Sequence, residues 1–525
     1  MKRTITLLAI LTGLCVSASG QPAGTLDVTF NGTGKVIYNR ERTDVYWDVK
    51  TQADGKIVAV GTSFDAMWAS TIEVTRYMPD GTFDPSFGTG GHFNYSPNYE
   101  TGAHKCFITE DGKILVAGYT TDYMNYSMVV IQLDANGNPD PAFGNNGVVL
   151  LDQSAGEEIL YAIAVQDDGK ILVAGYAQNN DFKNVPVVIR LTENGTLDDT
   201  FGTNGTAGVD ITEIDNEFAA LAIQQDGKIV AAGHISNGMS WFSVLVARFD
   251  QDGVLDPAYG TGGIVNLNLN NVDDEIFDLQ LTENDEALLA GFTVTQPDIY
   301  YHLLLMKLDI TGQPVTAFGN NGIVTAGETA FTFGDAIALQ TDGRIVVAGC
   351  TGEAPPNNND WSVWRFMADG SPDPDFGTNG SVTTEFSGFA DEALGLSLYQ
   401  DKIVVAGKAR NADNFLDFAV ARYLNDVGVA VEENFVNSRI SVSPNPAKRG
   451  SSFSITYEMN TTGSVVAEVR NMIGNKVTSF EAGTQTAGRN TLTLPVPASW
   501  SAGVYFIRIM ASGSDTQTVR VIVTE

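Results

Sequence analysis

The sequence predicts an all-β protein, a seven-bladed β-propeller followed by a small Ig-like β-sandwich. A tight turn, a short apolar run and a glycine recur seven times, with 57 or 58 residues between successive glycines. The 54 glycines and the charged fraction of only 18% are typical of short strands joined by turns. After residue 426 this period stops, and a second series of short alternating strands follows.

The repeating unit is clearest at Asp168-Gly169-Lys170, where a turn precedes the apolar run that ends at Gly175. Each unit contains four β-rich segments separated by Gly, Asp and Asn turns. One such sheet cannot bury both of its faces, so we expect each sheet to pack on the next and the array to close into a ring. A β-solenoid is the alternative, although its turns are usually shorter and lack repeated hairpins. The repeat glycines are Gly61, Gly118, Gly175, Gly233, Gly291, Gly349 and Gly407.

Three markers recur in residues 25–426: Leu-Asp-x-x-Phe-Gly, Asp-Gly-Lys-Ile-x-Val-Ala-Gly and Val-x-Arg-Tyr. They resemble the delta-60 repeat family, β-propeller-like repeats common in secreted bacterial proteins. Repeat 5 departs most, because Glu283-Asn284-Asp285-Glu286 replaces the Asp-Gly-Lys turn and Val315 replaces the aspartate. The resemblance implies the fold and export, and it implies no activity.

A basic residue in the fourth segment and an aspartate before the Phe-Gly pair recur in most units. We expect an Arg–Asp pair, or an Arg bonded to turn carbonyls, to lock each connection between blades. A ring of ligand-binding arginines is the alternative. The pairs are Arg76 and Asp84, Arg190 and Asp198, Arg248 and Asp256, and Arg365 and Asp373.

A second acidic position lies ten residues before the turn aspartate, at Asp44, Glu158, Glu275 and Asp391. We expect it to cap a strand or to line the central channel, and it is too irregular for a ring of metal ligands. No calcium-hand motif appears, so we predict no metal site and no cofactor. No motif in the sequence supports the binding of a divalent cation such as calcium.

The two faces of the propeller are expected to differ. The Asp-Gly-Lys turns and the Asp-x-x-Phe-Gly connections share one face, and the loops after Ala-Gly, which vary in sequence, lie on the other. We predict that this variable face binds a ligand, because exposed aromatic rings beside Asn and Asp suit sugar or protein recognition. The alternative is that the rings pack against adjacent blades. The predicted ligand-binding residues are Trp68, Tyr123, Tyr126, Trp241, Tyr300, Tyr301 and Trp361.

Catalytic motifs are absent from the sequence. His92, His104, His234 and His302 are scattered, and there is neither a Gly-x-Ser-x-Gly motif nor a phosphate loop. We therefore expect no catalytic residues and no enzyme. Because carboxylates are abundant, a polysaccharide lyase or hydrolase is the alternative, and a structural surface-layer component is a third.

Charge and targeting signals point to export. The net charge of −33 repels phosphate backbones, so nucleic acid is not an expected partner. Residues 1–20 have the pattern of a signal peptide, and no later run is long enough for a transmembrane segment.

Cys106 resembles a core residue, and a disulfide between Cys106 and Cys350 is not expected. We expect a monomer.

The C-terminal part begins after a polar linker, residues 427–438. Residues 439–525 show six or seven short alternating strands, so a small sandwich is predicted. The Ser-Pro-Asn-Pro opening at Ser443, the Met-Ile-Gly-Asn-Lys-Val turn and the Gly-Val-Tyr-Phe-Ile-Arg strand resemble the C-terminal sorting domain of type IX secretion in the Bacteroidota. The resemblance implies that the type IX machinery is a partner and that the protein is secreted or placed on the outer cell surface. An ordinary adhesive sandwich domain is the alternative.

Overall fold

The computed structural model describes two compact units, residues 20–428 and a C-terminal unit that begins at residue 429. It describes all residues except 1–20, 41–42, 98–99, 122–125, 153–155, 210–214, 237–240, 270–271, 296–299, 328–330, 353–358, 387, 426–440, 444, 446, 460–461, 472–475, 498–499, 502, 512–516 and 525. The predicted signal peptide and the predicted linker therefore lie outside the described residues. No helix among the described residues has the length and apolar character needed to cross a membrane.

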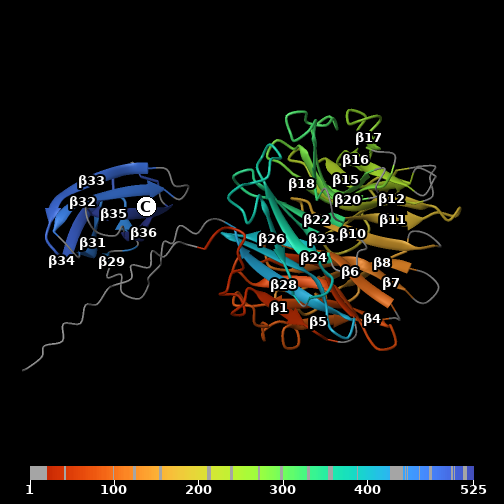
Figure 1. The fold of residues 1–525 in the computed structure, drawn as a ribbon, viewed down its shortest axis with the longest axis horizontal. Coiled ribbons are helices and arrows are strands. Elements are labelled where there is room, and N and C mark those ends of the chain that lie inside the picture. The colour runs from red at the N-terminus through yellow and green to blue at the C-terminus, as the bar shows by residue number, and fades with distance from the viewer. Residues whose placement is uncertain are drawn as a thin grey trace, which may run out of the picture. The chain divides into compact units, whose positions relative to one another are not determined.

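The first unit is a ring of seven four-stranded antiparallel sheets (Figure 1). The first strand of each sheet packs against the first strands of both neighbouring sheets, so these seven strands surround the centre. Blades 1 to 3 contain β2 (Thr43–Thr51), β3 (Ile57–Phe64), β4 (Ser70–Tyr77) and β5 (His92–Tyr95); β6 (Glu100–Ile108), β7 (Ile114–Thr121), β8 (Tyr126–Leu133) and β9 (Val148–Leu151); and β10 (Glu158–Val165), β11 (Ile171–Gln178), β12 (Asn184–Leu191) and β13 (Thr206–Gly208). Blades 4 to 6 contain β14 (Asn216–Ile223), β15 (Ile229–Ser236), β16 (Phe242–Phe249) and β17 (Ile264–Leu267); β18 (Asp274–Leu281), β19 (Ala287–Thr295), β20 (Tyr300–Leu308) and β21 (Ile323–Ala326); and β22 (Phe331–Leu339), β23 (Ile345–Gly352), β24 (Asn359–Phe366) and β25 (Ser381–Thr384).

Blade 7 joins the two ends of the ring. Its first three strands are β26 (Asp391–Tyr399), β27 (Lys402–Arg410) and β28 (Leu416–Leu424), and its outer strand is the N-terminal β1 (Lys35–Tyr38). Val36 pairs with Val420, and Leu26 forms a further bridge with Tyr423. Hydrogen bonds between residues nearly four hundred positions apart therefore close the propeller, and β1 covers the edge that β28 would otherwise expose.

The repeat glycine is required by a β-bulge in the inner strand of every blade. In blade 3 the register shifts between Leu160 and Ala162, opposite Gly175. A Cβ at Gly175 would lie 1.9 Å from the carbonyl oxygen of Ile159, and the other six repeat glycines have the same contact at 1.9–2.2 Å. The seven-fold period in the sequence is therefore the period of a close backbone approach at a bulge.

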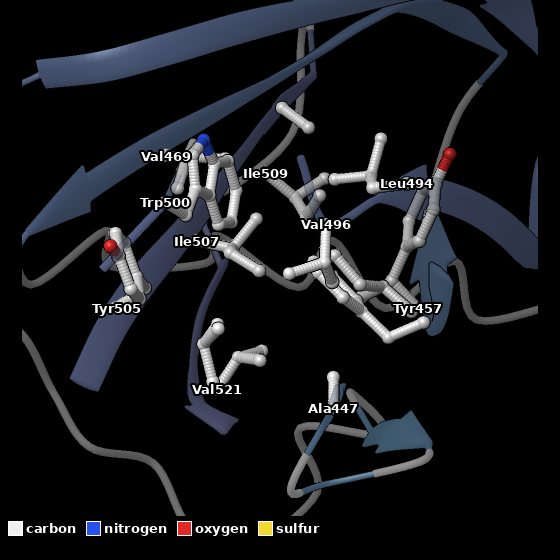
Figure 2. Packing of buried hydrophobic residues seen from close by; sticks show 14 of the residues in the cluster. Ala447, Tyr457, Val469, Leu494, Val496, Trp500, Tyr505, Ile507, Ile509 and Val521 are labelled. Atoms are coloured by element: carbon white, nitrogen blue, oxygen red, sulfur yellow. The ribbon is translucent and has the colours of Figure 1, made fainter. Parts of the chain in front are cut away.

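The C-terminal unit is a sandwich of two sheets, ordered β29-β31-β34 and β30-β36-β35-β32-β33. Side chains of both sheets share one core, which includes Tyr457 and Leu494 from the first and Val469 and Ile507 from the second (Figure 2). There are eight strands rather than six or seven, because β29 and β30 are very short. The immunoglobulin-like character stays a prediction. The strands are β29 (Ser441–Ser443), β30 (Ala447–Lys448), β31 (Ser452–Met459), β32 (Gly463–Asn471), β33 (Lys476–Gln485), β34 (Gly488–Pro495), β35 (Gly503–Ala511) and β36 (Gln517–Thr524).

Candidate functional site

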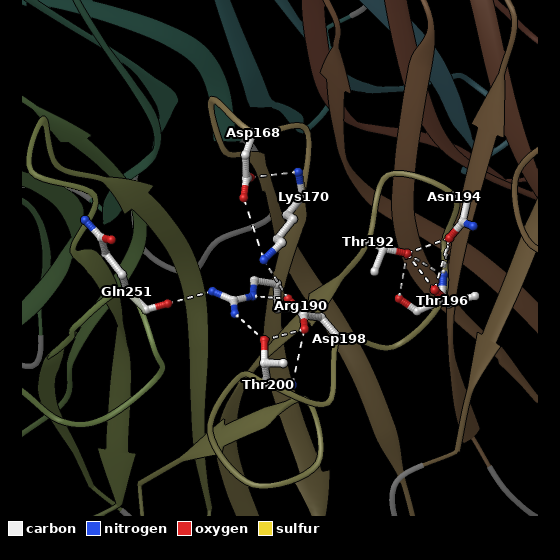
Figure 3. Close-up of polar contacts among 9 residues, drawn as sticks. All are labelled: Asp168, Lys170, Arg190, Thr192, Asn194, Thr196, Asp198, Thr200 and Gln251. Carbon is white, nitrogen blue, oxygen red and sulfur yellow. Dashed lines mark hydrogen bonds and ion pairs between the residues drawn. The ribbon is translucent and has the colours of Figure 1, made fainter.

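The turn face, which carries the Asp-Gly-Lys turns, is held by one polar arrangement that we call the clasp (Figure 3). In blade 3, Arg190 Nε donates to Asp198 Oδ2 at 2.8 Å, and the guanidinium lies over the Phe201 ring at 4.6 Å. Lys170 of the turn approaches the same carboxylate oxygen at 3.1 Å. Arg190 Nη1 also donates to the carbonyl oxygen of Gln251 in blade 4 at 2.6 Å. One buried arginine therefore connects its own turn with the next blade.

Five clasps contain both predicted contacts, the Arg–Asp pair and the bond to a turn carbonyl. Their Arg–Asp distances are 2.8–2.9 Å. The fifth, between Arg422 and Asp27, uses an aspartate of the N-terminal segment and so adds side chains to the ring closure. Burial alone would raise the pKa of Asp84, but hydrogen bonds from Ser86 and the charge of Arg76 lower it to about 2. The pairs are Arg76–Asp84, Arg190–Asp198, Arg248–Asp256, Arg365–Asp373 and Arg422–Asp27.

Blades 2 and 5 have altered clasps. Blade 2 has Gln132 in place of the arginine, and Lys113 pairs with Asp140 at 3.1 Å. In blade 5, Glu286 stands where other turns have a lysine or an arginine, and it pairs with Lys307 at 2.6 Å. The carboxylate missing at Val315 is thus supplied by the turn, and Lys307 keeps an ion pair.

The centre of the ring is bridged by charged side chains. Lys105 of blade 2 meets Asp278 of blade 5 at 3.1 Å, although these blades are not neighbours. Burial alone would lower the pKa of Lys105, but the charges of Asp278 and Asp48 raise it. A cavity of about 260 Å³ beside this pair is lined by Lys50 and Gln280 among others. These charges are balanced, so we assign the group a structural role.

The predicted aromatic residues of the variable face differ in exposure. Trp68 lies in the loop between β3 and β4 and is 52% exposed. Trp361 is fully buried in β24 between blades 6 and 7, with its ring tilted against Phe386, so its prediction as a ligand-binding residue was wrong. The strand β24 begins at Asn359, two residues before Trp361, whereas the sequence suggested a loop up to Trp361.

Four other predicted rings, all among the described residues, are not on open loops. Tyr126, Tyr300 and Tyr301 begin strands β8 and β20 and are half-buried. Trp241 precedes β16 and packs against the small core around Val294. Tyr123 lies outside the described residues. Packing against neighbouring blades, the alternative to ligand binding, therefore describes Tyr301, which contacts Phe331 and Phe333.

Two exposed aromatics are held in a strained backbone conformation. Trp68 and Phe182 have φ of 65° and 59°, a left-handed region that bulky residues rarely occupy. Their loops, 65–69 and 179–183, have the same turn as loop 411–415, where Asn414 has φ of 67°. In each loop the first side chain accepts two backbone N–H bonds. Phe182 is 76% exposed and was not predicted, since every predicted ligand-binding residue is a Trp or a Tyr.

The second acidic position caps the inner strands where they begin at the variable face. Asp44 and Asp391 are fully buried and accept backbone N–H bonds from the preceding loop. In blade 5 this role belongs to Asp274, not to the predicted Glu275. The predicted position was one residue too late because the ten residues were counted from Asp285. Asp285 occupies the left-handed turn position, with φ of 61°, that Gly343 occupies in blade 6.

Glu275 instead belongs to an acidic cluster between blades 4 and 5. Glu217 of β14 and Glu275 of β18 lie 3.8 and 3.7 Å from Nδ1 of His234 in β15. Burial and the charges of Glu275 and Asp215 raise the pKa of Glu217 to about 8. Burial, with Asp273 and Asp215, raises the pKa of Glu275 to about 7. Burial lowers the pKa of His234 to about 4, so this ring is neutral at pH 7.

The sequence signal for this cluster is the residue after each repeat glycine. It changes from blade to blade, whereas the glycine before it does not. His234, Phe292 and Lys408 occupy this position in blades 4, 5 and 7, opposite Glu217, Glu275 and Glu392. The acidic cluster therefore lies among the non-repeating residues near the variable face.

Comparisons with known families agree with this architecture. The family described as "Domain of unknown function (DUF5122) beta-propeller" matches residues 52–87, 109–143, 166–201, 224–259, 340–376 and 401–426. The family described as "Secretion system C-terminal sorting domain" matches residues 441–524. Repeat 5 is the one without a match, in keeping with its altered turn and clasp. No curated protein matches the chain.

Solved structures resemble the chain only distantly. A protein of unknown function from Dyadobacter fermentans has 10% identity and a TM-score of 0.38, covering 74% of this chain and 98% of its own. The polysaccharide lyase Uly1 has 11% identity and a TM-score of 0.40, with coverages of 72% and 90%. The sialidase of Trypanosoma rangeli has 8% identity and a TM-score of 0.34, with coverages of 94% and 89%. At these scores none of their activities carries over to this chain.

Proposed function

Since the chain is a DUF5122 β-propeller protein with a type IX sorting domain, and is therefore secreted to the cell surface or beyond it, we propose that it is a non-catalytic binding module. Its variable face recognises a glycan or a protein, and its C-terminal domain engages the secretion machinery. The module works as a monomer.

The observation that carries this proposal is the pair of exposed, left-handed aromatics, Trp68 and Phe182. Asn414 in the matching loop shows that asparagine suits this backbone position, so the turn itself does not require an aromatic ring there, although the Trp68 ring also contacts Phe64 edge-on. Asn179 and Asp181 are neighbours of Phe182, and a ring beside amide and carboxylate groups offers a saccharide both an apolar surface and hydrogen-bond partners. A glycan is thus favoured over a protein.

The test is a glycan array probed with the full secreted chain and with a Trp68→Asn/Phe182→Asn variant. We expect array binding by the wild-type chain and at least about a tenfold loss of affinity in the variant, the equivalent of about 1.4 kcal/mol. The matched control is Val254→Thr/Ile310→Thr, which changes two exposed apolar residues of the turn face (60% and 54% exposed). Equal binding by both variants would contradict the proposal.

A hydrolase is the second candidate, because Glu217 and Glu275 have raised pKa values that suit proton transfer at neutral pH. Release of reducing sugar from a bound polysaccharide, abolished by Glu217→Gln, would favour the enzyme. Binding without release favours the module.

A further inference from the structure

The acidic cluster brings together carboxyl groups that lack a cationic partner. Among the described residues, no lysine or arginine pairs with Glu217 or Glu275, and the basic side chain between them, His234, is neutral. Their side chains are only 20% and 17% exposed, so water screens them weakly. Asp215 and Asp273 add two further carboxylates nearby. Buried charges are normally paired.

In blade 7, the glutamate equivalent to Glu217 and Glu275 has a cationic partner. There Glu392 lies opposite Lys408, and the two make an ion pair of 2.7 Å. Lys408 follows Gly407 as His234 follows Gly233 and Phe292 follows Gly291. Two of the three glutamates at this position, Glu217 and Glu275, thus lack the lysine that faces Glu392.

The geometry around His234 fits an ammonium group. His234 is 8% exposed, and Nδ1 makes no hydrogen bond among the described residues; both carboxylates lie beyond hydrogen-bond distance. Separations of 3.7 and 3.8 Å are too short for an atom between the groups, but one polar atom placed beside them can lie within hydrogen-bond distance of the imidazole nitrogen and of a carboxylate oxygen. A primary ammonium has three N–H donors, which matches two carboxylates and one imidazole nitrogen.

Aromatic rings surround the polar groups. Phe242 lies 4.4 Å from the His234 ring, and Tyr301 lies 5.3 Å from Phe292. The Tyr161 hydroxyl is a further polar neighbour of Glu217. Aromatic faces add attraction for an organic cation and contact its alkyl carbons. A hard metal ion would need six or more oxygens, and no group of metal-ligating side chains was found among the described residues.

We propose that the space bounded by Glu217, His234 and Glu275 binds a primary ammonium group of a ligand that reaches the variable face between blades 4 and 5. The ligand supplies the cation that Lys408 supplies in blade 7. This inference goes beyond the proposed glycan binding and does not depend on Trp68 or Phe182.

Binding depends on pH because the carboxyls must lose their protons. Both glutamates have pKa values above their usual range, so affinity rises as the pH increases from about 6 to about 8. The other titratable groups that face the site are Asp215 and Asp273, which add negative charge, and the hydroxyls of Tyr161, Tyr176 and Tyr301. Burial first, and nearby carboxylates second, raise the pKa of each tyrosine, so these stay neutral.

The test is calorimetric titration of the full chain with n-butylammonium chloride, with n-butanol and calcium chloride as matched probes. We expect binding of the ammonium alone, tighter at pH 8 than at pH 6. Glu217→Gln/Glu275→Gln is expected to lose at least tenfold in affinity. His234→Lys, which rebuilds the pairing of blade 7, is expected to abolish binding while the chain stays folded. The Trp68→Asn/Phe182→Asn variant is expected to bind n-butylammonium as the wild type does.

Three results would overturn the inference: equal ammonium binding by wild type and His234→Lys, tighter binding of calcium than of ammonium, or butanol binding as well as butylammonium. Because the loop variant separates the two surfaces, loss of glycan binding with retained ammonium binding, or the reverse, identifies which proposal has failed.

Discussion

The turn face and the variable face are the two ends of the same strands, and they differ in what repeats. At the turn face, an arginine, an aspartate and an aromatic ring recur in five of seven blades with nearly identical distances. At the variable face, the residues after the repeat glycines are Thr62, Tyr119, Tyr176, His234, Phe292, Cys350 and Lys408. Side chains that recur at the same position in most blades, such as those of the clasp, stabilise the blade. Residues that differ among equivalent positions are free to recognise a ligand.

The largest effect is expected when one clasp is broken. Arg190→Ala leaves Asp198, which is 7% exposed, without its buried partner, so we expect a loss of about 3–5 kcal/mol in the free energy of unfolding. Urea denaturation followed by fluorescence measures it. Adding Asp198→Ala should recover part of the loss. A single variant as stable as the wild type would show that the clasp does not hold the blades.

A smaller loss is expected at the repeat glycine. Gly175→Ala places a Cβ 1.9 Å from the Ile159 carbonyl oxygen, and the required backbone shift should cost about 1–3 kcal/mol. Gly208→Ala is the matched control, since its nearest neighbour would be 3.6 Å away and only a small change is expected. Thermal denaturation compares the two. Equal midpoints would refute the bulge as the origin of the period.

The altered clasp of blade 5 offers a test by restoration. Val315→Asp adds a carboxylate near Glu286 without adding a cation, so we expect it to cost about 1 kcal/mol. Glu286→Lys/Val315→Asp rebuilds the charge pattern of blade 3 and should be more stable than Val315→Asp. A double-mutant cycle measures the coupling between positions 286 and 315. Zero coupling would contradict the view that Glu286 replaces the carboxylate missing at Val315.

The smallest effect is expected at the loop tips of the variable face. Trp68→Asn and Phe182→Asn replace strained aromatics with the residue found at Asn414, so stability should rise by about 1 kcal/mol or less. Calorimetry of each single variant measures this change. A clear destabilisation would mean that these rings serve folding, and they would lose their role as evidence for binding.

The difference between the repeating residues of the turn face and the non-repeating residues of the variable face explains what the sequence could predict. Strand order, ring closure, the clasp residues and the sorting domain were predictable because their signals recur or occur in a fixed order. Trp361 was misplaced because a loop of variable length conceals where its strand begins. The acidic cluster was missed because its members come from two blades: Glu217 and Glu275 are one repeat period apart, and nothing in the sequence indicates that both lie beside His234. Only the blade geometry brings them together.

Cys106 and Cys350 illustrate the limits of single residues as signals. Both are buried and free of a disulfide, and the burial of Cys106 confirms its prediction as a core residue. Burial, followed by the charge of Asp48, raises the pKa of the Cys106 thiol well above its usual range, so it is a poor nucleophile. Cys350 occupies the position of His234 two blades further on, yet it faces a different set of neighbours.

The central claim, that the variable face binds while the turn face holds the ring together, is tested most directly by hydrogen–deuterium exchange with and without the glycan that binds best on the array. We predict slower exchange in loops 65–69 and 179–183 on binding, and unchanged exchange at the Asp168-Gly169-Lys170 turn and its six counterparts. Protection confined to those turns would contradict the claim.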